Sequence, residues 1–173
     1  MFKYVLANST KHDGTSILKA IDEFCWNGHW MNHTGDRKGK ILDKAIKESK
    51  PKKALEIGTY LGYGTIRIAR LMEKGSRLVS IDVNKKWQQL ASKVIKYAGV
   101  DDIVTLKSGK LIDHIDWLIN TMEYFDFIFL DHNVESFLED MKMLEIRGCL
   151  KHGTTVVVDK ILWPGSPDMR LYL

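Results

Sequence analysis

Acidic residues and glycines in this sequence form a pattern typical of a nucleoside-binding turn. Glu56 precedes a segment that contains Gly58, Gly62 and Gly64, and Asp82 closes the next apolar run. Glycines let the backbone turn sharply against a ligand, and the helix expected after the turn begins with unpaired N–H groups. A carboxylate at Asp82 suits two ribose hydroxyls, and Glu56 suits a cationic amino group. The pattern indicates S-adenosylmethionine binding; an ordinary strand-to-helix turn followed by a surface acid is the alternative.

The order of these glycines argues against a nicotinamide cofactor. A dinucleotide-binding turn has the pattern Gly-x-Gly-x-x-Gly, whereas the order from Gly58 is Gly-x-x-x-Gly-x-Gly. The separation of Gly58 from Asp82, about 24 residues, matches a turn, a helix and a second strand of a doubly wound sheet. The sequence therefore disfavours a dehydrogenase.

Two later apolar runs also end in acidic residues. Asp131 is followed by His132, and Asp159 is followed by Lys160. Ligands of doubly wound sheets lie beyond the carboxyl ends of the strands, so both carboxylates are expected near the ligand. Two neighbouring carboxylates can share a hard cation such as Mg²⁺, which prefers oxygen ligands. Each aspartate taken singly also fits a helix N-cap.

The elements that position these residues alternate along the chain. Helical apolar spacing occurs at residues 17–25, 41–46 and 87–98, and short apolar runs lie between helical patterns. Such alternation predicts an α/β fold, a doubly wound and mostly parallel sheet with helices on both faces. The five expected strands are residues 54–57, 77–82, 103–106, 125–130 and 154–158.

Composition limits the chain to one domain and excludes several classes of protein. With 173 residues, 45% of them hydrophobic, we expect one domain over residues 1–173, with residues 1–15 as a flexible extension. The net charge of +4 is spread over helix faces, so nucleic-acid binding is not expected. Cys25 and Cys149 fit free thiols in a reducing compartment. No run approaches the length of a membrane span, and we expect a cytoplasmic protein.

From Ile17 onward the sequence resembles the catechol O-methyltransferase family, whose blocks recur in order. The resemblance implies a class I fold that uses S-adenosylmethionine and Mg²⁺ to methylate a hydroxyl of a catechol or phenol. Family members continue beyond the fifth strand with a helix and two further strands, and we expect the last two family strands to be missing from this chain. Residues 154–158 would then form an open sheet edge, where another chain can pair, although we expect a monomer. The matching blocks are residues 28–32, 35–43, 55–63, 97–100, 129–132 and 163–168.

The resemblance also assigns roles to individual residues. Asp131 and Asp159 would be the two aspartate ligands of the metal. Glu56 and Tyr60 would contact the amino acid end of the cofactor, Asp82 its ribose, and His132 would lie near the adenine. Trp30 and Pro164 would be walls for the flat substrate ring, with Lys160 beside it. The full set of expected cofactor contacts is Thr34 (or Asn32 if the loop register shifts), Glu56, Gly58, Tyr60, Gly64, Asp82, Val83, Asp131 and His132.

Several positions depart from the family pattern. Lys160 stands at the third metal-ligand position, and Val134 stands where the family has its catalytic lysine. Valine cannot accept a proton, and a charged lysine repels a cation. Gly64 replaces a hydroxyl residue at the cofactor, and Asn133 replaces an aromatic wall.

Three hypotheses for Lys160 follow from these departures. Its ammonium can lie between Asp131 and Asp159 and substitute for the metal, it can serve as a base when neutral, or it can be a surface lysine. Two functions remain open for the whole chain: an S-adenosylmethionine-dependent O-methyltransferase, or a catalytically weak relative that binds the cofactor or a partner.

Overall fold

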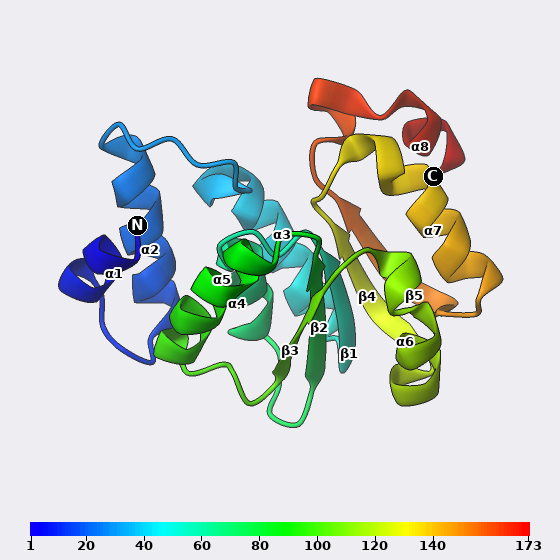
Figure 1. The fold of residues 1–173 in the computed structure, drawn as a ribbon, viewed down its shortest axis with the longest axis horizontal. Helices are drawn as coiled ribbons and strands as arrows, with labels where there is room; N and C mark the ends of the chain where they lie inside the picture. The colour runs from blue at the N-terminus through cyan, green and yellow to red at the C-terminus, as the bar shows by residue number, and fades with distance from the viewer.

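A computed structural model describes residues 1–173 and contains one five-stranded sheet. All strand pairs are parallel, and the strand order is β3-β2-β1-β4-β5 (Figure 1). The chain therefore builds the sheet outward from β1, first toward β3 and then toward β5. The expected fold class and number of strands are confirmed, with small differences in the ends of three strands. The strands are β1 (Lys53–Ile57), β2 (Arg77–Asp82), β3 (Val104–Ser108), β4 (Phe125–Leu130) and β5 (Leu150–Val158).

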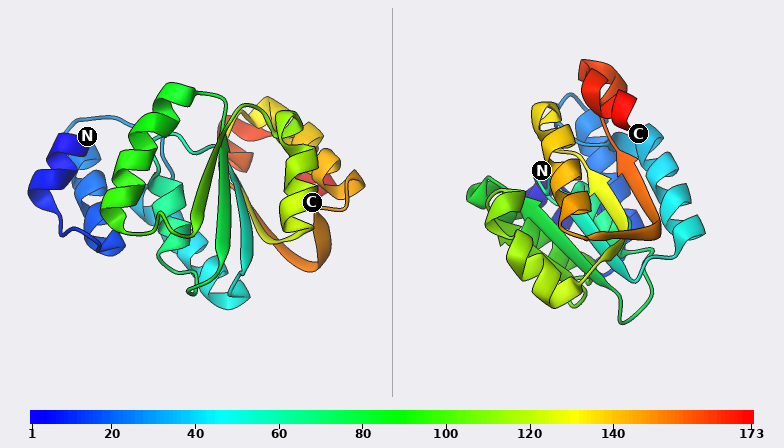
Figure 2. Two further views of the ribbon diagram at one scale, coloured as in Figure 1. Left: turned by 60° about the horizontal axis from the view of Figure 1, so that its bottom comes forward. Right: turned by 90° about the vertical axis from the view of Figure 1, so that its right-hand side faces the viewer.

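Helices cover both faces of the sheet because residues on both sides of its central strands are buried. Leu55 and Ile57 of β1 pack into the cluster formed with the helices of one face, and Ala54 packs into the cluster of the opposite face. Figure 2 shows the two helical layers with the sheet between them. One face carries α3 (Gly35–Ser49), α4 (Tyr63–Ala69) and α5 (Lys85–Ala98), and the other carries α6 (Ile115–Met122) and α7 (Phe137–Ile146).

The two ends of the chain add short helices outside these layers. Residues 1–15, expected to be a flexible extension, instead include α1 (Phe2–Asn8), whose Val5 is fully buried. Asp13 begins α2 (Gly14–Trp26) by accepting the N–H groups of two residues in its first turn. At the other end, η3 (Ile161–Gly165) leads into α8 (Pro167–Tyr172).

Strand β5 lies at the edge of the sheet and pairs only with β4. It begins at Leu150, four residues before the expected start, because Phe125 of β4 pairs with Leu150 across a register irregularity. Residues 154–158 are half-buried, in contrast to the fully buried residues of the central strands. The open edge expected at residues 154–158 is therefore present in this chain.

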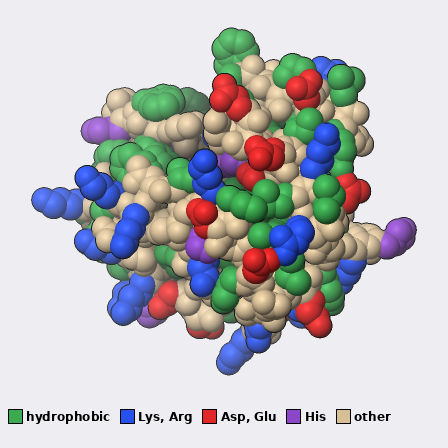
Figure 3. Space-filling model, turned by 45° about the vertical axis from the view of Figure 1, so that its right-hand side comes forward, with side chains coloured by type: hydrophobic (Ala, Val, Ile, Leu, Met, Phe, Trp, Pro, Cys, Tyr) green, Lys and Arg blue, Asp and Glu red, His purple; other side chains and the backbone are tan.

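The surface of the molecule mixes residue types. Figure 3 shows acidic, basic and hydrophobic side chains interspersed on one face. None of the helices has the length and apolar character needed to cross a bilayer.

The parallel register aligns the carboxyl ends of four strands. Ile57 lies opposite both Ile81 and Leu130, and Leu130 lies opposite Val158. The residues that follow continue the ladder, since the N–H of Asp131 donates to the carbonyl of Ile57 at 2.9 Å. The turn after β1 and the acidic ends of β2, β4 and β5 therefore share one edge of the sheet.

Gly58 is required where β1 and β4 come together at this edge. Its φ is +107°, and a Cβ built on it would lie 2.4 Å from the carbonyl oxygen of Asp131. Such a contact cannot be relieved by a side-chain rotation, because the neighbour is backbone. The glycine therefore sets how closely the turn after β1 approaches Asp131.

Substitution of Gly58 by alanine tests this packing constraint. We expect Gly58→Ala to lower the free energy of unfolding by about 3 kcal/mol or more, because strain at positive φ adds to the backbone overlap. Gly75→Ala is the matched control, since Gly75 has φ +85° with nothing within 4 Å of its Cβ, and we expect it to cost only about 1 kcal/mol. Urea unfolding measures both; equal losses would contradict the constraint.

Candidate functional site

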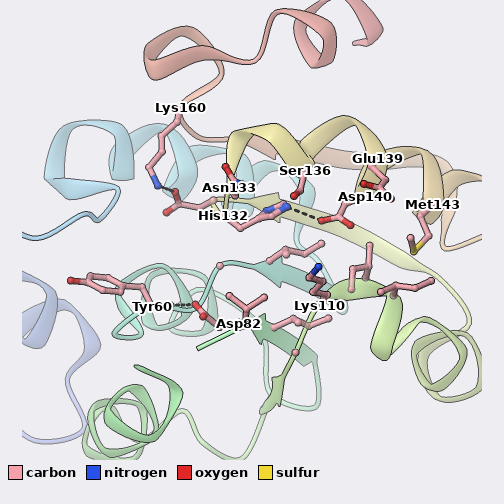
Figure 4. A pocket seen from close by; sticks show the side chains of 18 of the residues that line it. Tyr60, Asp82, Lys110, His132, Asn133, Ser136, Glu139, Asp140, Met143 and Lys160 are labelled. Carbon is pink, nitrogen blue, oxygen red and sulfur yellow. Dashed lines mark hydrogen bonds and ion pairs between the residues drawn. The ribbon is translucent and has the colours of Figure 1, made fainter. Parts of the chain in front are cut away.

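A cavity of about 720 Å³ opens at the carboxyl edge of the sheet. Its walls come from the turns after β1, β2, β3 and β4, from α7 and from the segment after β5 (Figure 4). Several residues expected at the site therefore share one space: Asn32, Gly58, Tyr60, Asp82, Val83, Asp131, His132 and Lys160.

Asp82 is held at the end of β2 by two backbone groups. Its Oδ2 accepts the N–H of Tyr60 at 2.7 Å, and its Oδ1 accepts the N–H of Asn84 at 2.7 Å. Tyr60 reaches this position with a left-handed backbone, φ +46°. Each carboxylate oxygen has a second lone pair, so Asp82 can still accept hydrogen bonds from a ligand in the cavity.

Glu56 lies fully buried behind the turn and does not line the cavity. Its Oε2 accepts the hydroxyls of Thr65 and Ser80, both at 2.5 Å, whereas its Oε1 has no hydrogen-bond partner. A Cβ on Gly64 would lie 2.4 Å from that Oε1, so the glycine leaves room for the carboxylate. Burial raises the pKa of Glu56 to about 8.

The acidic ends of β4 and β5 are each paired with a lysine. Lys160 Nζ donates to Asp131 Oδ1 at 2.5 Å, and Thr34 donates to Asp131 Oδ2 at 3.3 Å. Lys38 Nζ, from α3, donates to both carboxylate oxygens of Asp159, at 2.5 and 2.7 Å. Burial raises the pKa of Asp131, and the Lys160 ammonium opposes that shift.

The hypothesis that the Lys160 ammonium bridges Asp131 and Asp159 is only half correct, because the ammonium pairs with Asp131 alone. The ammonium contacts Asp131, while the backbone N–H of Lys160 donates to Asp159 Oδ1 at 2.7 Å. Asp159 receives its cation from Lys38 instead. Lys38 is the main site residue that the sequence does not single out, since its charge is one of those expected on helix faces. Its position in the block 35–43 shared with the family was the available signal.

Helix α3 is fixed against α4 by a buried group of charges. Asp43 of α3 lies 3.0 Å from Arg67 Nε and 2.6 Å from an Arg70 nitrogen. These contacts hold α3 beside the sheet, where Lys38, one turn and a half earlier, reaches Asp159. The ion pair between Lys38 and Asp159 therefore depends on how α3 packs against α4.

Val134 packs against the hydrophobic cluster beneath α7, and its carbonyl accepts the Ser166 hydroxyl at 3.2 Å. No proton acceptor occupies the position of the family's catalytic lysine. His132 Nε2 contacts Asp140 Oδ2 at 2.7 Å (Figure 4).

Some expected substrate and cofactor residues lie outside the cavity wall. Trp30 and Pro164 are both exposed to solvent, and neither lines the cavity. Thr34 is buried and does not line the cavity, although its hydroxyl donates to Asp131, which does. Asn32 lines the cavity. Their contacts with a ligand remain predictions, as do those of Gly64.

Asn133, which stands at the family's aromatic-wall position, also lines the cavity. The other loop and helix residues of the wall had no signal in the sequence, because their contribution depends on how α7 and the turn after β3 pack. They are Gly109, Lys110, Leu111, Ile112, Ser136, Glu139, Asp140 and Met143.

The residues at the acidic ends do not fit a divalent cation. Asp131 and Asp159 are already neutralised by ammonium groups, and the third position, Lys160, is a donor without a lone pair to offer. No group of three or more His, Cys, Asp or Glu residues is placed to hold a metal ion. Mg²⁺ binds through oxygen ligands. The two carboxylates that could supply them, Asp131 and Asp159, each face a lysine ammonium instead.

The other end of the cavity fits S-adenosylmethionine. Asp82 offers lone pairs to a ribose, Gly58 and Tyr60 bring backbone close to the space, and Glu56 has an unpartnered buried oxygen next to the turn.

Comparison with known proteins agrees with this fold and cavity. The O-methyltransferase TomG from Streptomyces achromogenes, solved in complex with SAM, superposes with a TM-score of 0.75 at 26% identity over 87% of this chain and 69% of that chain. Catechol O-methyltransferase B of Danio rerio is 39% identical over 100% of this chain, and catechol O-methyltransferase of Bos taurus is 34% identical over 100%. This chain spans 66% and 64% of those two proteins, slightly under two thirds.

The family model for O-methyltransferases matches residues 8–168. The chain therefore belongs to the O-methyltransferase family and is homologous to catechol O-methyltransferases over its full length, which confirms the resemblance found in the sequence.

The buried carboxyl of Glu56 should make stability depend on pH. The folded protein keeps a proton on Glu56 that the unfolded chain releases above its ordinary pKa of 4.5. The stabilisation is complete below pH 4.5 and is lost as pH rises toward 8. We expect a loss of about 1 kcal/mol per pH unit in that window, absent in Glu56→Gln. Urea unfolding at several pH values measures it, with the exposed Glu48→Gln as control; an unchanged slope in Glu56→Gln would contradict the burial effect.

Proposed function

We propose that this protein transfers a methyl group from S-adenosylmethionine to a hydroxyl of a catechol or phenol. The observation that carries the proposal is the single cavity that joins Asp82, at the end expected to bind the cofactor, to Asp131 and Lys160 at the other end. The names of the Danio rerio and Bos taurus relatives support a catechol acceptor.

Each end of the cavity has a distinct role in this proposal. Bound S-adenosylmethionine supplies an electrophilic methyl group. Asp82 accepts the ribose hydroxyls, the turn at Gly58 and Tyr60 closes over the amino acid end, and the unpartnered Oε1 of Glu56 lies behind it. Gly64, Val83 and His132 complete the proposed cofactor contacts.

The proposed acceptor lies at the end with Lys160. Trp30 and Pro164, now exposed, would approach the acceptor ring when it binds. The residues at this end hold and orient the acceptor oxygen, which must face the methyl group for transfer.

A second candidate function has one specific observation in its favour. Val134 packs against the core cluster and cannot accept a proton, so the site lacks a base at the expected position. A general base contributes about 10²–10⁴ in rate, and its loss favours a protein that binds the cofactor with little turnover. The cytoplasmic location, the monomeric state and a partner at the β5 edge stay predictions.

A transfer assay separates these two functions. The protein is incubated with S-adenosylmethionine labelled in the methyl group and with a panel of catechols and phenols. Labelled product supports the methyltransferase. Cofactor binding by calorimetry without labelled product supports the weak relative, and absence of cofactor binding contradicts both.

Asp82 provides a direct test of cofactor binding. We expect Asp82→Asn to weaken S-adenosylmethionine binding by about 10-fold or more, because hydrogen bonds to a charged group are lost while the side-chain shape is kept. Isothermal calorimetry measures the change. Asp101→Asn removes a carboxylate from an exposed turn and should leave affinity unchanged; equal affinities for the two variants would place the ribose elsewhere.

A further inference from the structure

Lys160 presents an ammonium group to the cavity at the end proposed for the acceptor. The side chain is only 14% exposed, and its one hydrogen-bond partner is Asp131 Oδ1 at 2.5 Å. An ammonium has three N–H donors, so two remain for a ligand. In Figure 4 the Lys160 side chain extends toward the cavity from the segment after β5.

The backbone around Lys160 fixes this position. Its φ is +61°, a left-handed conformation, and its N–H donates to Asp159 Oδ1 at 2.7 Å. Asp159 is in turn held by Lys38, whose ammonium contacts both carboxylate oxygens. Lys38 therefore satisfies Asp159 and leaves the Lys160 ammonium to Asp131 alone, which makes Lys38 a positioning residue.

The four side chains balance each other in charge. Two carboxylates and two ammonium groups leave no net negative charge to attract a divalent cation. Lys38 lies in the block 35–43 shared with the family, so the departure from the metal-binding pattern rests on Lys160.

We propose that Lys160 takes over the task of a metal ion and holds the acceptor through one oxygen, so that the substrate is an acidic phenol bound as its anion. The inference rests on the proposed function and narrows its substrate class. A metal ion can bind two adjacent hydroxyls at once, whereas an ammonium can hold one acceptor oxygen with a single N–H hydrogen bond. The site thus requires no vicinal diol.

An anionic acceptor also agrees with the missing base. Val134 cannot take a proton, and an ammonium that donates to Asp131 cannot take one either. When the acceptor oxygen forms its bond to the methyl carbon, the C–S bond of the sulfonium breaks. The negative charge on oxygen and the positive charge on sulfur cancel, so no proton has to move.

Binding of para-nitrophenolate tests the acceptor site without turnover. The absorption band of this phenolate shifts when it receives a hydrogen bond from a cation. We expect the wild type with bound S-adenosylhomocysteine to bind it in EDTA, Lys160→Met to weaken binding about tenfold or more, and Lys160→Arg to retain most of it. The double variant Asp131→Asn/Lys160→Met removes both members of the buried ion pair. It serves as a control for misfolding, because Lys160→Met alone leaves the Asp131 carboxylate buried without its cation. Equal binding by wild type and both methionine variants would overturn the inference.

A metal titration supplies the second readout. Calorimetric titration with MgCl₂ should give no stoichiometric binding to the wild type, whereas Lys160→Asn removes a positive charge and adds an amide oxygen, so its affinity should rise about tenfold or more. Lys47→Asn, at the far end of α3, is the charge-matched control. Stoichiometric Mg²⁺ binding by the wild type, with no gain in Lys160→Asn, would overturn the inference.

Failure of the inference and failure of the proposed function give different results. Phenolate binding that depends on Lys160, without methyl transfer to any acceptor, supports the inferred site and contradicts the proposed function. Transfer that requires a catechol and Mg²⁺ supports the proposed function and overturns the inference.

Discussion

The close approach of β1 and β4 at Gly58 is the constraint on which the rest of the site depends. Because the backbone of Asp131 passes within 2.4 Å of where a Cβ would stand, the turn after β1 and the end of β4 form one continuous wall. The parallel register then places the ends of β2 and β5 on either side. A ligand bound against Asp82 on one side therefore faces Lys160 on the other, across the same cavity.

The charges at the end of β4 and β5 are organised as two ion pairs. A buried carboxylate without a counter-ion is costly, so Asp131 and Asp159 each require a cation. Homologous proteins can meet this need in different ways, and here two lysines on separate elements supply it. This arrangement keeps the acidic strand ends of the family and places an ammonium against each of them.

Much of the fold was accessible from the sequence because its signals are local. The apolar run at β4 and the glycines before α4 predict their own elements, and strand ends predict which carboxylates meet. The Lys38–Asp159 pair could not be derived in this way, since it joins residues 121 positions apart through the packing of α3. The same holds for Trp30 and Pro164, whose exposure is decided by the path of two loops rather than by their residue types.

A crystal structure of the protein with S-adenosylhomocysteine, grown with Mn²⁺ in the solution, tests the central claim most directly. Manganese is visible by its anomalous scattering and takes the same oxygen ligands as magnesium. We expect the ribose hydroxyls on Asp82, Lys160 Nζ on Asp131, Lys38 Nζ on Asp159, and no anomalous peak between the two carboxylates. A manganese peak shared by Asp131 and Asp159, with Lys160 turned away, would contradict the claim.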